Sequence, residues 1–268
     1  SKVAIVAPAS AIHSDQLAVG LNLIKEAGLV PVLGPCVKRL RADGLHSAPL
    51  EERVDEFNWA FSDPQISAVI CALGGMGSSG ILPFIDYEVV KKTRKPLLGR
   101  SDITSLNLGF LKHAGLISIN GQTPSICVDK GEKYKATQSE SFLMTLELMM
   151  GSEAWGSIPF GYNPHIPQTV CAGFASGHAI GGNGDTLTRL LGTPHLPDFR
   201  GTVLFIEDIH ESSEDLAREF LHLKLSGVLE QVAGVVIGEF QDNRKNVPHV
   251  EDVIQEYFAN GPPCVYGY

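Results

Sequence analysis

The sequence lacks the signatures of several functional classes. Its five cysteines are widely spaced and include no Cys-x-x-Cys pair, which argues against a zinc site or a disulfide framework and favours a reducing compartment. It has no apolar run long enough to cross a membrane, no internal repeat and no low-complexity tract. Its densest basic run, KKTRK at 91–95, is expected at a solvated helix end, where cations favour the helix dipole. Because the formal net charge is −9, we expect no nucleic-acid partner.

The start of the sequence carries no secretion signal. It opens on an apolar predicted strand at 3–8 rather than on the charged and apolar regions of a signal peptide. A signal peptide that had already been removed would leave no trace. The cysteine pattern and the lack of a membrane span lead us to expect a cytoplasmic protein with no membrane partner.

What is present is an alternation of short apolar stretches with amphipathic ones. In the first 150 residues, strands are expected at 3–8, 30–33, 68–73, 97–99 and 116–119, and helices at 14–27, 50–61, 101–112 and 139–150. This alternation predicts a doubly wound, mostly parallel sheet with helices on both faces. In open sheets of this kind, binding sites gather at the carboxyl ends of the strands.

A change of composition separates this part from the rest. Residues 151–172 are rich in small and turn-forming residues and show little periodicity, so they predict a linker between a domain at 1–150 and a domain at 173–268. In the second domain, a glycine-rich segment at 177–183 leads into a helix, and alternating strands and helices follow. The predicted fold class is therefore α/β, with an N-terminal doubly wound, mostly parallel sheet domain plus a smaller C-terminal α/β domain.

The most informative stretch is LLGRSDIT at 97–104. It predicts a buried strand that runs through Gly99 into a sharp turn, with a helix starting at or just after Ser101. A serine at such an elbow has its hydroxyl lifted off the sheet, and the N–H groups of the helix N-terminus can stabilise an oxyanion. Ser101 is therefore a candidate nucleophile. Ser-Asp before an apolar run is also an ordinary helix cap, so both interpretations are open.

Two further segments follow predicted strands. Gly74-Gly75-Met76-Gly77 permits positive φ and close approach of the backbone, so it either donates an N–H to an oxyanion or carboxylate or forms a plain turn. Glu207-Asp208 terminates a predicted strand in the second half. Acids at that place are either exposed residues at a strand end or the group that orients a catalytic base.

The order and wording of these segments resemble the serine L,D-carboxypeptidase family, which includes the muramoyl-tetrapeptide carboxypeptidases and the microcin C immunity hydrolases. The resemblance covers essentially the whole chain. The motifs that carry it are VAIVAPAS at 3–10, GGMG at 74–77 with LPFIDY at 82–87, GRSDIT at 99–104, GGN at 181–183 with LLGTP at 190–194, LFIED at 204–208 and VVIGEF at 235–240. Each motif is weak by itself, but six in the same order and at similar spacing are specific.

The resemblance implies a Ser-Glu-His triad with no metal and no organic cofactor. Ser101 matches the nucleophile, and Glu207 matches the acid that orients the base. The N–H groups of Asp102 and of the Gly74-Gly75 turn match the oxyanion hole. The implied mechanism is acyl transfer through an acyl-enzyme, which water then hydrolyses.

The resemblance also implies a substrate class and a partner. The family cleaves an L-to-D bond, typically releasing the terminal D-alanine of a peptidoglycan tetrapeptide, so we expect a small peptide or muropeptide as substrate. We expect Asn183 to shape the groove between the domains and Met76 to line the substrate pocket. A homodimer is expected from the family.

The match fails at the catalytic histidine. In the family this residue lies in a Gly-His pair just beyond the final strand, which is Cys264–Tyr268 here, where the sequence ends. His178 and His210 lie near matching segments, but neither takes the place of that histidine by motif. Three explanations are open: a tail that carries the histidine, a shortened chain, or a natural protein without the base.

Other departures concern specificity. The arginine that usually precedes the Gly-Gly turn is Leu73, the usual aromatic in the turn is Met76, and the arginine often found before Leu-Leu-Pro is Gly80. The His-Gly-Pro of the family reads NGQTP at 120–124. Because arginines recognise carboxylates, these changes suggest a substrate other than the standard tetrapeptide.

Two alternative functions therefore stay open. The first is a microcin-type immunity hydrolase that cleaves an acyl-sulfamoyl or aminoacyl-nucleotide amide, which needs an aromatic wall that Trp155 or Phe160 could supply. The second is a catalytically silent binder of cell-wall peptides, which keeps Ser101 and the groove but lacks the base. A general serine esterase fits less well, because the elbow reads Gly-x-Ser-Asp rather than Gly-x-Ser-x-Gly.

Overall fold

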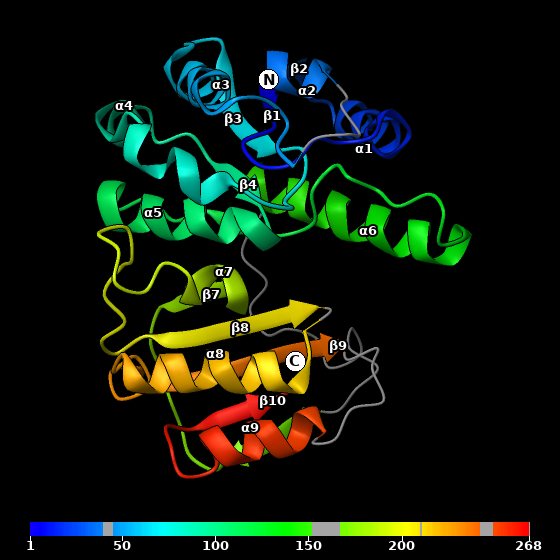
Figure 1. The fold of residues 1–268 in the computed structure, drawn as a ribbon. Coiled ribbons are helices and arrows are strands. Elements are labelled where there is room, and N and C mark those ends of the chain that lie inside the picture. The colour runs from blue at the N-terminus through cyan, green and yellow to red at the C-terminus, as the bar shows by residue number, and fades with distance from the viewer. Residues whose placement is uncertain (40–44, 152–166, 210, 242–248, 268) are drawn as a thin grey trace. The chain divides into compact units, whose positions relative to one another are not determined.

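A computed structural model describes residues 1–39, 45–151, 167–209, 211–241 and 249–267 of the chain (Figure 1). It divides the chain into two compact units, Ser1–Ala154 and Trp155–Tyr268, and each unit is built around its own sheet. Most of the predicted linker at 151–172 lies outside the described residues, as do Trp155, Phe160 and His210.

The first unit contains a five-stranded parallel sheet. Its strands in spatial order are β2 (Val30–Leu33), β1 (Lys2–Val6), β3 (Ile66–Cys71), β4 (Leu97–Gly99) and β5 (Ile119–Asn120). All four neighbouring pairs run parallel, and the register pairs Val6 with Cys71 and Leu98 with Ile119. The central strands are buried on both faces, which explains why they are apolar without alternation.

Helices cover both faces of this sheet. In Figure 1, α1 (Ser14–Glu26) and α6 (Glu132–Met149) lie together on one side, and α3 (Leu50–Ser62), α4 (Tyr87–Thr93) and α5 (Thr104–Ala114) lie on the other. This is the outcome of right-handed crossovers when the chain first moves from β1 to β2 and then reverses through β3 to β5. The prediction of a doubly wound, mostly parallel sheet is confirmed.

The reversal of strand order places a switch point between β1 and β3. Ligands of open α/β sheets bind outside the carboxyl ends of the strands at such a point. The segments that leave β1, β3 and β4 there contain Ser10, Gly74 and Ser101. Two 3-10 helices continue from this edge, η1 (Ser78–Phe84) after β3 and η2 (Ser101–Ile103) before α5.

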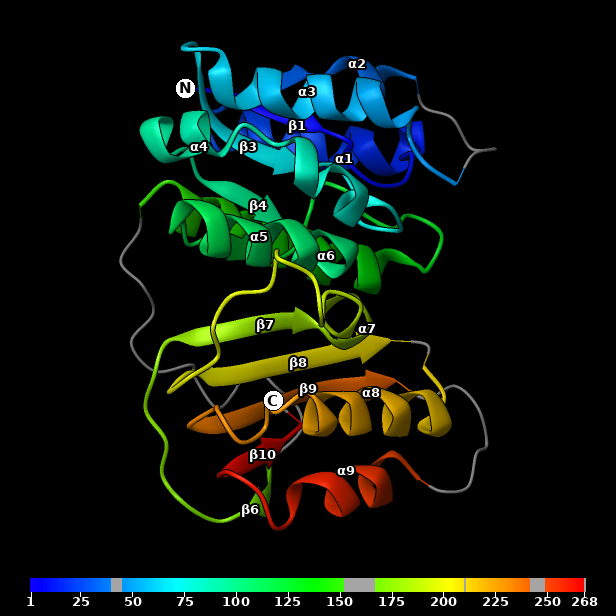
Figure 2. The ribbon, with the colours of Figure 1, turned by 60° about the vertical axis from the view of Figure 1, so that its left-hand side comes forward.

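The second unit is also built on a five-stranded sheet with helices (Figure 2). Its strands in spatial order are β6 (Gln168–Cys171), β10 (Cys264–Tyr266), β9 (Gly234–Gln241), β8 (Val203–Ile209) and β7 (Ala179–Asn183), and its helices are α7 (Gly184–Thr188), α8 (Ser213–Leu225) and α9 (Val250–Phe258). The pairs formed by β7, β8, β9 and β10 are parallel, whereas β6 runs antiparallel to β10.

Several predicted elements differ in the structure. In the first unit, the strand expected at 116–119 is β5 at 119–120, and the helix expected at 139–150 already begins at Glu132. The end of the predicted linker forms β6, and the glycine-rich segment at 177–183 contributes β7. Gly181 allows β7 to pair closely with β8, because a Cβ at Gly181 would lie 1.7 Å from the carbonyl oxygen of Phe205. Glycine has a low propensity for strands, so the sequence did not predict a strand at this place. Finally, β8 continues to Ile209, so Glu207 and Asp208 lie within the strand rather than at its last residues.

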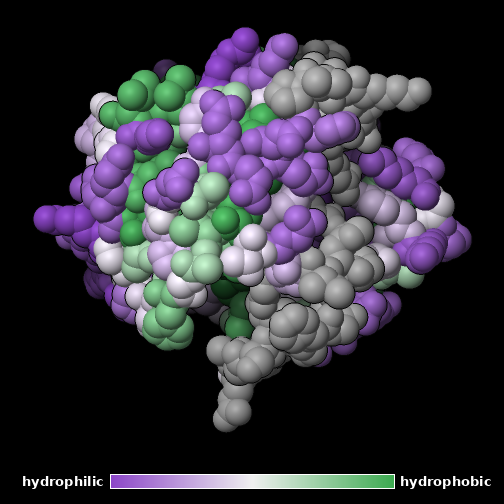
Figure 3. Space-filling model, turned by 90° about the horizontal axis from the view of Figure 1, so that it is seen from below, coloured by the Kyte–Doolittle hydropathy of each residue, from purple (hydrophilic) through white to green (hydrophobic). Residues whose placement is uncertain are grey.

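No helix in the described part of the chain is both long enough and apolar enough to cross a bilayer. On the face drawn in Figure 3, green hydrophobic areas are interrupted by purple hydrophilic residues. Such mixing is ordinary for a surface exposed to water, where apolar atoms contribute more than half of the area.

A buried carboxylate connects β1 with the short helix α2 (Pro35–Lys38). Glu56 on α3 is 2% exposed and accepts hydrogen bonds from the N–H groups of Ala7 at 2.7 Å and Cys36 at 2.8 Å. A Cβ at Gly34 would lie 2.1 Å from its Oε1, so the carboxylate occupies space that only a glycine leaves open. Glu56 thereby supplies acceptors to N–H groups at the start of α2 and at the carboxyl end of β1.

We predict that Glu56→Ala lowers the free energy of unfolding by about 3 kcal/mol, because buried N–H groups lose their acceptor. Urea unfolding monitored by circular dichroism measures the change. Glu51→Ala, which removes an exposed carboxylate from the same helix, is the control and should change stability by less than about 0.5 kcal/mol. Equal effects of the two substitutions would contradict this role of Glu56.

Candidate active site

Ser101 has a strained backbone. It stands between β4 and η2 with a φ of +59°, in the left-handed region that residues with a Cβ rarely adopt. The other described residue of this kind is Arg94, where the same conformation ends helix α4. At Ser101 the conformation instead produces a sharp strand-to-helix turn with a half-buried serine at its tip. The predicted elbow is therefore present.

The Gly74 turn packs directly against this elbow. A Cβ at Gly74 would lie 3.0 Å from the Cβ of Ser101, 3.0 Å from the carbonyl oxygen of Arg100 and 3.3 Å from the nitrogen of Asp102. Only a residue without a side chain permits this approach. The structure thus brings together the segments of the first unit that the sequence predicted for the nucleophile and the oxyanion hole.

Ser10 holds the Gly74 turn from the side of β1. Its N–H donates to the carbonyl oxygen of Gly74 at 3.2 Å, and its Oγ accepts from the N–H of Met76 at 3.1 Å. Gly75 has a φ of +98°, and a Cβ there would lie 2.2 Å from the Ser10 Oγ. The turn therefore keeps one shape, in which Gly75 and Met76 are exposed.

A buried arginine joins the same loops. Arg53 on α3 is 3% exposed, and its Nη1 donates to the carbonyl oxygens of Pro8 at 2.6 Å and Gly77 at 2.8 Å. Burial lowers the pKa of this guanidinium, and its Nε donates to a third carbonyl oxygen, that of Ala48, at 3.1 Å. Arg53 therefore ties the loop after β1 to the loop after β3.

Ser78 and Asp102 lock the elbow to the end of the Gly74 loop. The N–H of Ser78 donates to Asp102 Oδ2 at 2.8 Å, and its hydroxyl donates to the Asp102 carbonyl oxygen at 2.6 Å. The same hydroxyl lies 2.6 Å from the Ser105 Oγ. The carboxylate of Asp102 thus holds the loop after β3 against the Ser101 elbow. The N–H of Asp102 is a separate group, and it lies in the turn that carries Ser101.

Together these contacts create a preorganised site at the carboxyl edge of the first sheet. A serine hydroxyl stands on a rigid turn, a helix begins beneath it, and a glycine turn lies against it. Backbone N–H groups held in this way can stabilise developing negative charge on a substrate oxygen without reorganising. Such an arrangement suits nucleophilic attack on a carbonyl carbon.

Glu207 and Asn183 are backbone register partners in the second unit, at the carboxyl end of the β7–β8 pair. Glu207 is half-buried, and a Cβ at Gly238 on β9 would lie 3.0 Å from its Cβ, so the glycine leaves room beside this side chain.

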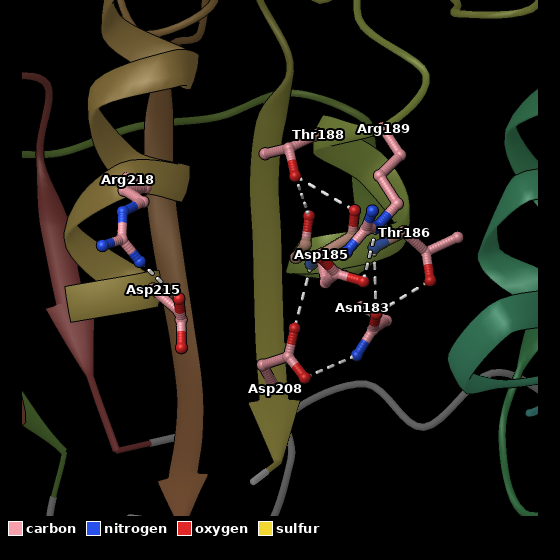
Figure 4. Close-up of polar contacts among 9 residues, drawn as sticks. Asn183, Asp185, Thr186, Thr188, Arg189, Asp208, Asp215 and Arg218 are labelled. Atoms are coloured by element: carbon pink, nitrogen blue, oxygen red, sulfur yellow. Dashed lines mark hydrogen bonds and ion pairs between the residues drawn. The ribbon is translucent and has the colours of Figure 1, made fainter. Parts of the chain in front are cut away.

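Asn183 is part of a buried polar network, shown in Figure 4. Its Nδ2 donates to Asp208 Oδ1 at 2.9 Å, and its Oδ1 accepts from the N–H of Thr186 at 3.1 Å. Asp208 Oδ2 also accepts from the N–H of Asp185 at 2.9 Å. Asn183 thus caps α7 and fixes the end of β8, a structural role that the sequence did not reveal.

The predicted site residues are divided between the two units. The first unit contains Gly74, Gly75, Met76, Ser101 and Asp102, and the second unit contains Asn183 and Glu207. His178 is exposed just before β7, and its carbonyl oxygen accepts from the N–H of Val203.

Sequence reasoning missed three residues that shape the first-unit site. Ser10 and Ser78 lie within or next to the quoted motifs, so their position could have drawn attention to them. Arg53 gave another signal, because it lies at helical spacing from Phe57 on the buried face of α3. A charged residue on an apolar face is informative, since it must find partners inside the protein.

A doubly wound sheet with a strained serine elbow at the carboxyl end of a central strand is typical of hydrolytic α/β enzymes with a serine nucleophile. Comparison with known proteins makes the class more specific. Residues 3–121 match the LD-carboxypeptidase N-terminal domain, and residues 176–268 match the LD-carboxypeptidase C-terminal domain. The chain belongs to the LD-carboxypeptidase family and is a peptidase of that family.

The names of similar proteins agree with this assignment. The murein tetrapeptide carboxypeptidase of Pseudomonas aeruginosa is 31% identical over 96% of this chain and 83% of its own length. The probable murein peptide carboxypeptidase of Bacillus subtilis is 30% identical over 99% of this chain and 82% of its own length. The microcin C7 self-immunity protein MccF of Escherichia coli is 28% identical over 88% of this chain and 73% of its own length.

Solved structures have the same fold. A muramoyltetrapeptide carboxypeptidase from Oxalobacter formigenes superposes with a TM-score of 0.79 at 26% identity, covering 100% of this chain and 88% of the other. MccF in complex with glutamyl sulfamoyl guanosine gives a TM-score of 0.85 at 23% identity, covering 100% and 87%. The resemblance inferred from the motifs and the α/β fold class are both confirmed.

We predict that Ser101→Gly raises the free energy of unfolding by about 1 kcal/mol relative to Ser101→Ala, because glycine adopts a positive φ without strain and alanine does not. Both substitutions remove the hydroxyl, so the pair isolates the strain of the backbone. Urea unfolding of the two variants measures the difference. If Ser101→Ala were the more stable variant, the elbow would not be strained as described.

Proposed function

We propose that this chain hydrolyses an L-to-D amide bond at the carboxyl end of peptidoglycan-derived tetrapeptides and releases D-alanine. The observation that carries the proposal is the strained Ser101 elbow packed against the Gly74 turn. The names of the relatives supply the substrate class, since two of them are named as murein peptide or murein tetrapeptide carboxypeptidases.

In the proposed first step, Ser101 Oγ attacks the carbonyl carbon of the scissile amide. The hydroxyl proton passes to a base, and the carbonyl oxygen becomes an oxyanion. The N–H groups of Asp102 and of the Gly74-Gly75 turn are proposed to donate to this oxyanion. The start of the helix beneath Ser101 adds a favourable dipole.

The tetrahedral intermediate then breaks its C–N bond. The base returns its proton to the leaving nitrogen, D-alanine departs, and the peptide remains as an ester on Ser101. In the second half, the base takes a proton from water, which attacks the ester carbonyl, and Ser101 recovers its proton. No oxidant, metal or further co-reactant is required for this balance.

Glu207 is proposed to act on the base rather than on the substrate. A carboxylate beside an imidazole selects its tautomer and stabilises the imidazolium that forms during each half-reaction. The half-buried place of Glu207 against Gly238 supports that role. The resemblance assigns the base to a histidine after the final strand, which no histidine of this sequence matches.

A second candidate function is the cleavage of an aminoacyl or peptidyl amide on a nucleotide. The similarity to MccF, which has been solved with glutamyl sulfamoyl guanosine and aspartyl sulfamoyl adenosine, suggests it. The residues beside the Gly74 turn favour it as well. Leu73 is half-buried and Met76 is 54% exposed. These two residues therefore offer an apolar surface on which the nucleobase of a substrate could pack, and they offer no cation that would bind the carboxylate of a peptide.

We also propose a homodimer in the cytoplasm. The dimer is carried over from the family resemblance, and the location rests on five free cysteines, three of them buried, which suit a reducing compartment. Light scattering on the purified protein tests the dimer, and a mass equal to one chain would contradict it.

The central prediction is that Ser101→Ala lowers kcat/KM for D-alanine release by about 10⁴-fold or more, because the nucleophile is lost. Glu207→Gln should lower it by about 10³-fold to 10⁴-fold, because an amide cannot stabilise the imidazolium. The assay is release of D-alanine from L-Ala-D-Glu-diaminopimelate-D-Ala by the natural protein in its full length.

Ser62→Ala, which removes an exposed hydroxyl at the end of α3, is the matched control and should keep normal activity. Glutamyl sulfamoyl adenosine, assayed in parallel, decides between the two candidate functions. Turnover of the tetrapeptide by Ser101→Ala would overturn the proposed nucleophile. Turnover of the nucleotide amide with an inert tetrapeptide would replace the first candidate by the second.

A further inference from the structure

Three carboxylates gather in the second unit away from the face of Glu207. Asp208 lies on β8, Glu211 follows that strand, and Glu219 lies on α8. One carboxylate oxygen of each residue lies within 4.8 Å of the corresponding oxygens of the other two. Because adjacent residues of a strand point to opposite faces, Asp208 points away from the side on which Glu207 lies.

Glu219 distinguishes this group from an ordinary acidic patch. The residue is 8% exposed, and within the described part of the chain its Oε2 has no hydrogen-bond partner. Burying a carboxylate oxygen without a hydrogen-bond donor costs free energy, so the unpaired oxygen indicates a bound ligand that interacts with it.

The neighbouring backbone leaves room for these oxygens. A Cβ at Gly184 would lie 2.7 Å from Glu219 Oε2 and 3.6 Å from Asp208 Oδ2. The missing side chain at the start of α7 thus opens the space in which both carboxylates meet.

The nearby arginines form their ion pairs with other carboxylates, although Arg189, whose pKa Asp185 raises, also lies near enough to Glu211 and Glu219 for their charges to raise its pKa further. Arg189 contacts the carboxylate of Asp185 at 2.7 Å and 2.8 Å, and Arg218 contacts that of Asp215 at 2.6 Å (Figure 4). Both arginine side chains are more than 70% exposed. Three carboxylates close together, two of them buried, therefore keep an excess of negative charge that a cation would neutralise.

The donor set selects the kind of cation. All three ligands are carboxylate oxygens, which hard cations prefer, whereas zinc in proteins favours nitrogen and sulfur. Ca²⁺ accepts irregular sets of six to eight oxygens, whereas Mg²⁺ demands a near-ideal octahedron and keeps most of its waters. The three carboxylates come from a strand, the segment after it and a helix, and such an irregular set of protein ligands suits the more adaptable Ca²⁺ ion.

We propose that Asp208, Glu211 and Glu219 bind one Ca²⁺ ion. The ion has a structural role: it joins the end of β8 to α8, and through the hydrogen bonds of Asp208 to Asn183 and to the Asp185 N–H it also fixes the start of α7. It takes no part in the proposed acyl transfer. The inference therefore stands or falls independently of the proposed function.

The test is calcium binding by the full chain, measured by isothermal titration calorimetry after treatment with EDTA and dialysis. We expect one site per chain. In parallel, calcium at about 100 times its Kd should raise the Tm by roughly 5 °C over the value in EDTA. Magnesium at the same concentration should raise it less.

Glu219→Gln keeps the shape of the side chain and removes its charge, so it should abolish both the binding heat and the Tm shift. Glu211→Gln, at a half-buried place, should weaken both and serves as a second variant. Glu214→Gln, on the exposed side of the same helix, is the control and should keep both. In EDTA, Glu219→Gln should be at least as stable as the parent protein, because it lacks the buried carboxyl.

Three results would overturn the proposal. The first is no calcium-dependent heat or Tm shift in the parent protein, which would leave a shared proton as the stabilising partner of Glu219. The second is an undiminished calcium response in Glu219→Gln. The third is binding of zinc or magnesium without binding of calcium.

Discussion

The left-handed backbone of Ser101 is the constraint on which the rest of the first-unit site depends. A residue with a Cβ keeps a φ of +59° only where its surroundings prevent relaxation. Here the surroundings are the Gly74 turn at van der Waals distance and the contacts of Ser78 with Asp102. Arg53 and Ser10 in turn hold that loop. These contacts thus hold Ser101 in a strained backbone conformation that places its hydroxyl at the tip of the turn.

The second unit uses a different device, which is the alternation of side chains along a strand. Glu207 and Asp208 are adjacent acids on β8, and the pleat sends them to opposite faces. Glu207 lies beside Gly238, whereas Asp208 joins Asn183 and the buried Glu219. Adjacent acids of one strand thus have different surroundings, and the proposed orienting acid is separate from the proposed calcium ligand.

Much of this was predictable from the sequence, and the remainder depended on tertiary contacts. The alternation of apolar and amphipathic stretches predicted the doubly wound sheet, and LLGRSDIT predicted the elbow, because both signals are local. The strand β7 was missed since Gly181 and Gly182 have low strand propensity, although they permit close pairing with β8. Arg53 and Glu219 acquire their roles from partners far away in sequence, which no local pattern shows.

The account rests on Ser101 as the nucleophile, and the most direct test is to trap its ester. The full-length natural protein would be mixed with the tetrapeptide, quenched with acid before the first turnover is complete, and digested for peptide mass spectrometry. We expect the tripeptide acyl group on Ser101, and no adduct on the Ser101→Ala variant. An acyl group on another residue, or the same adduct on the Ser101→Ala variant, would contradict the account.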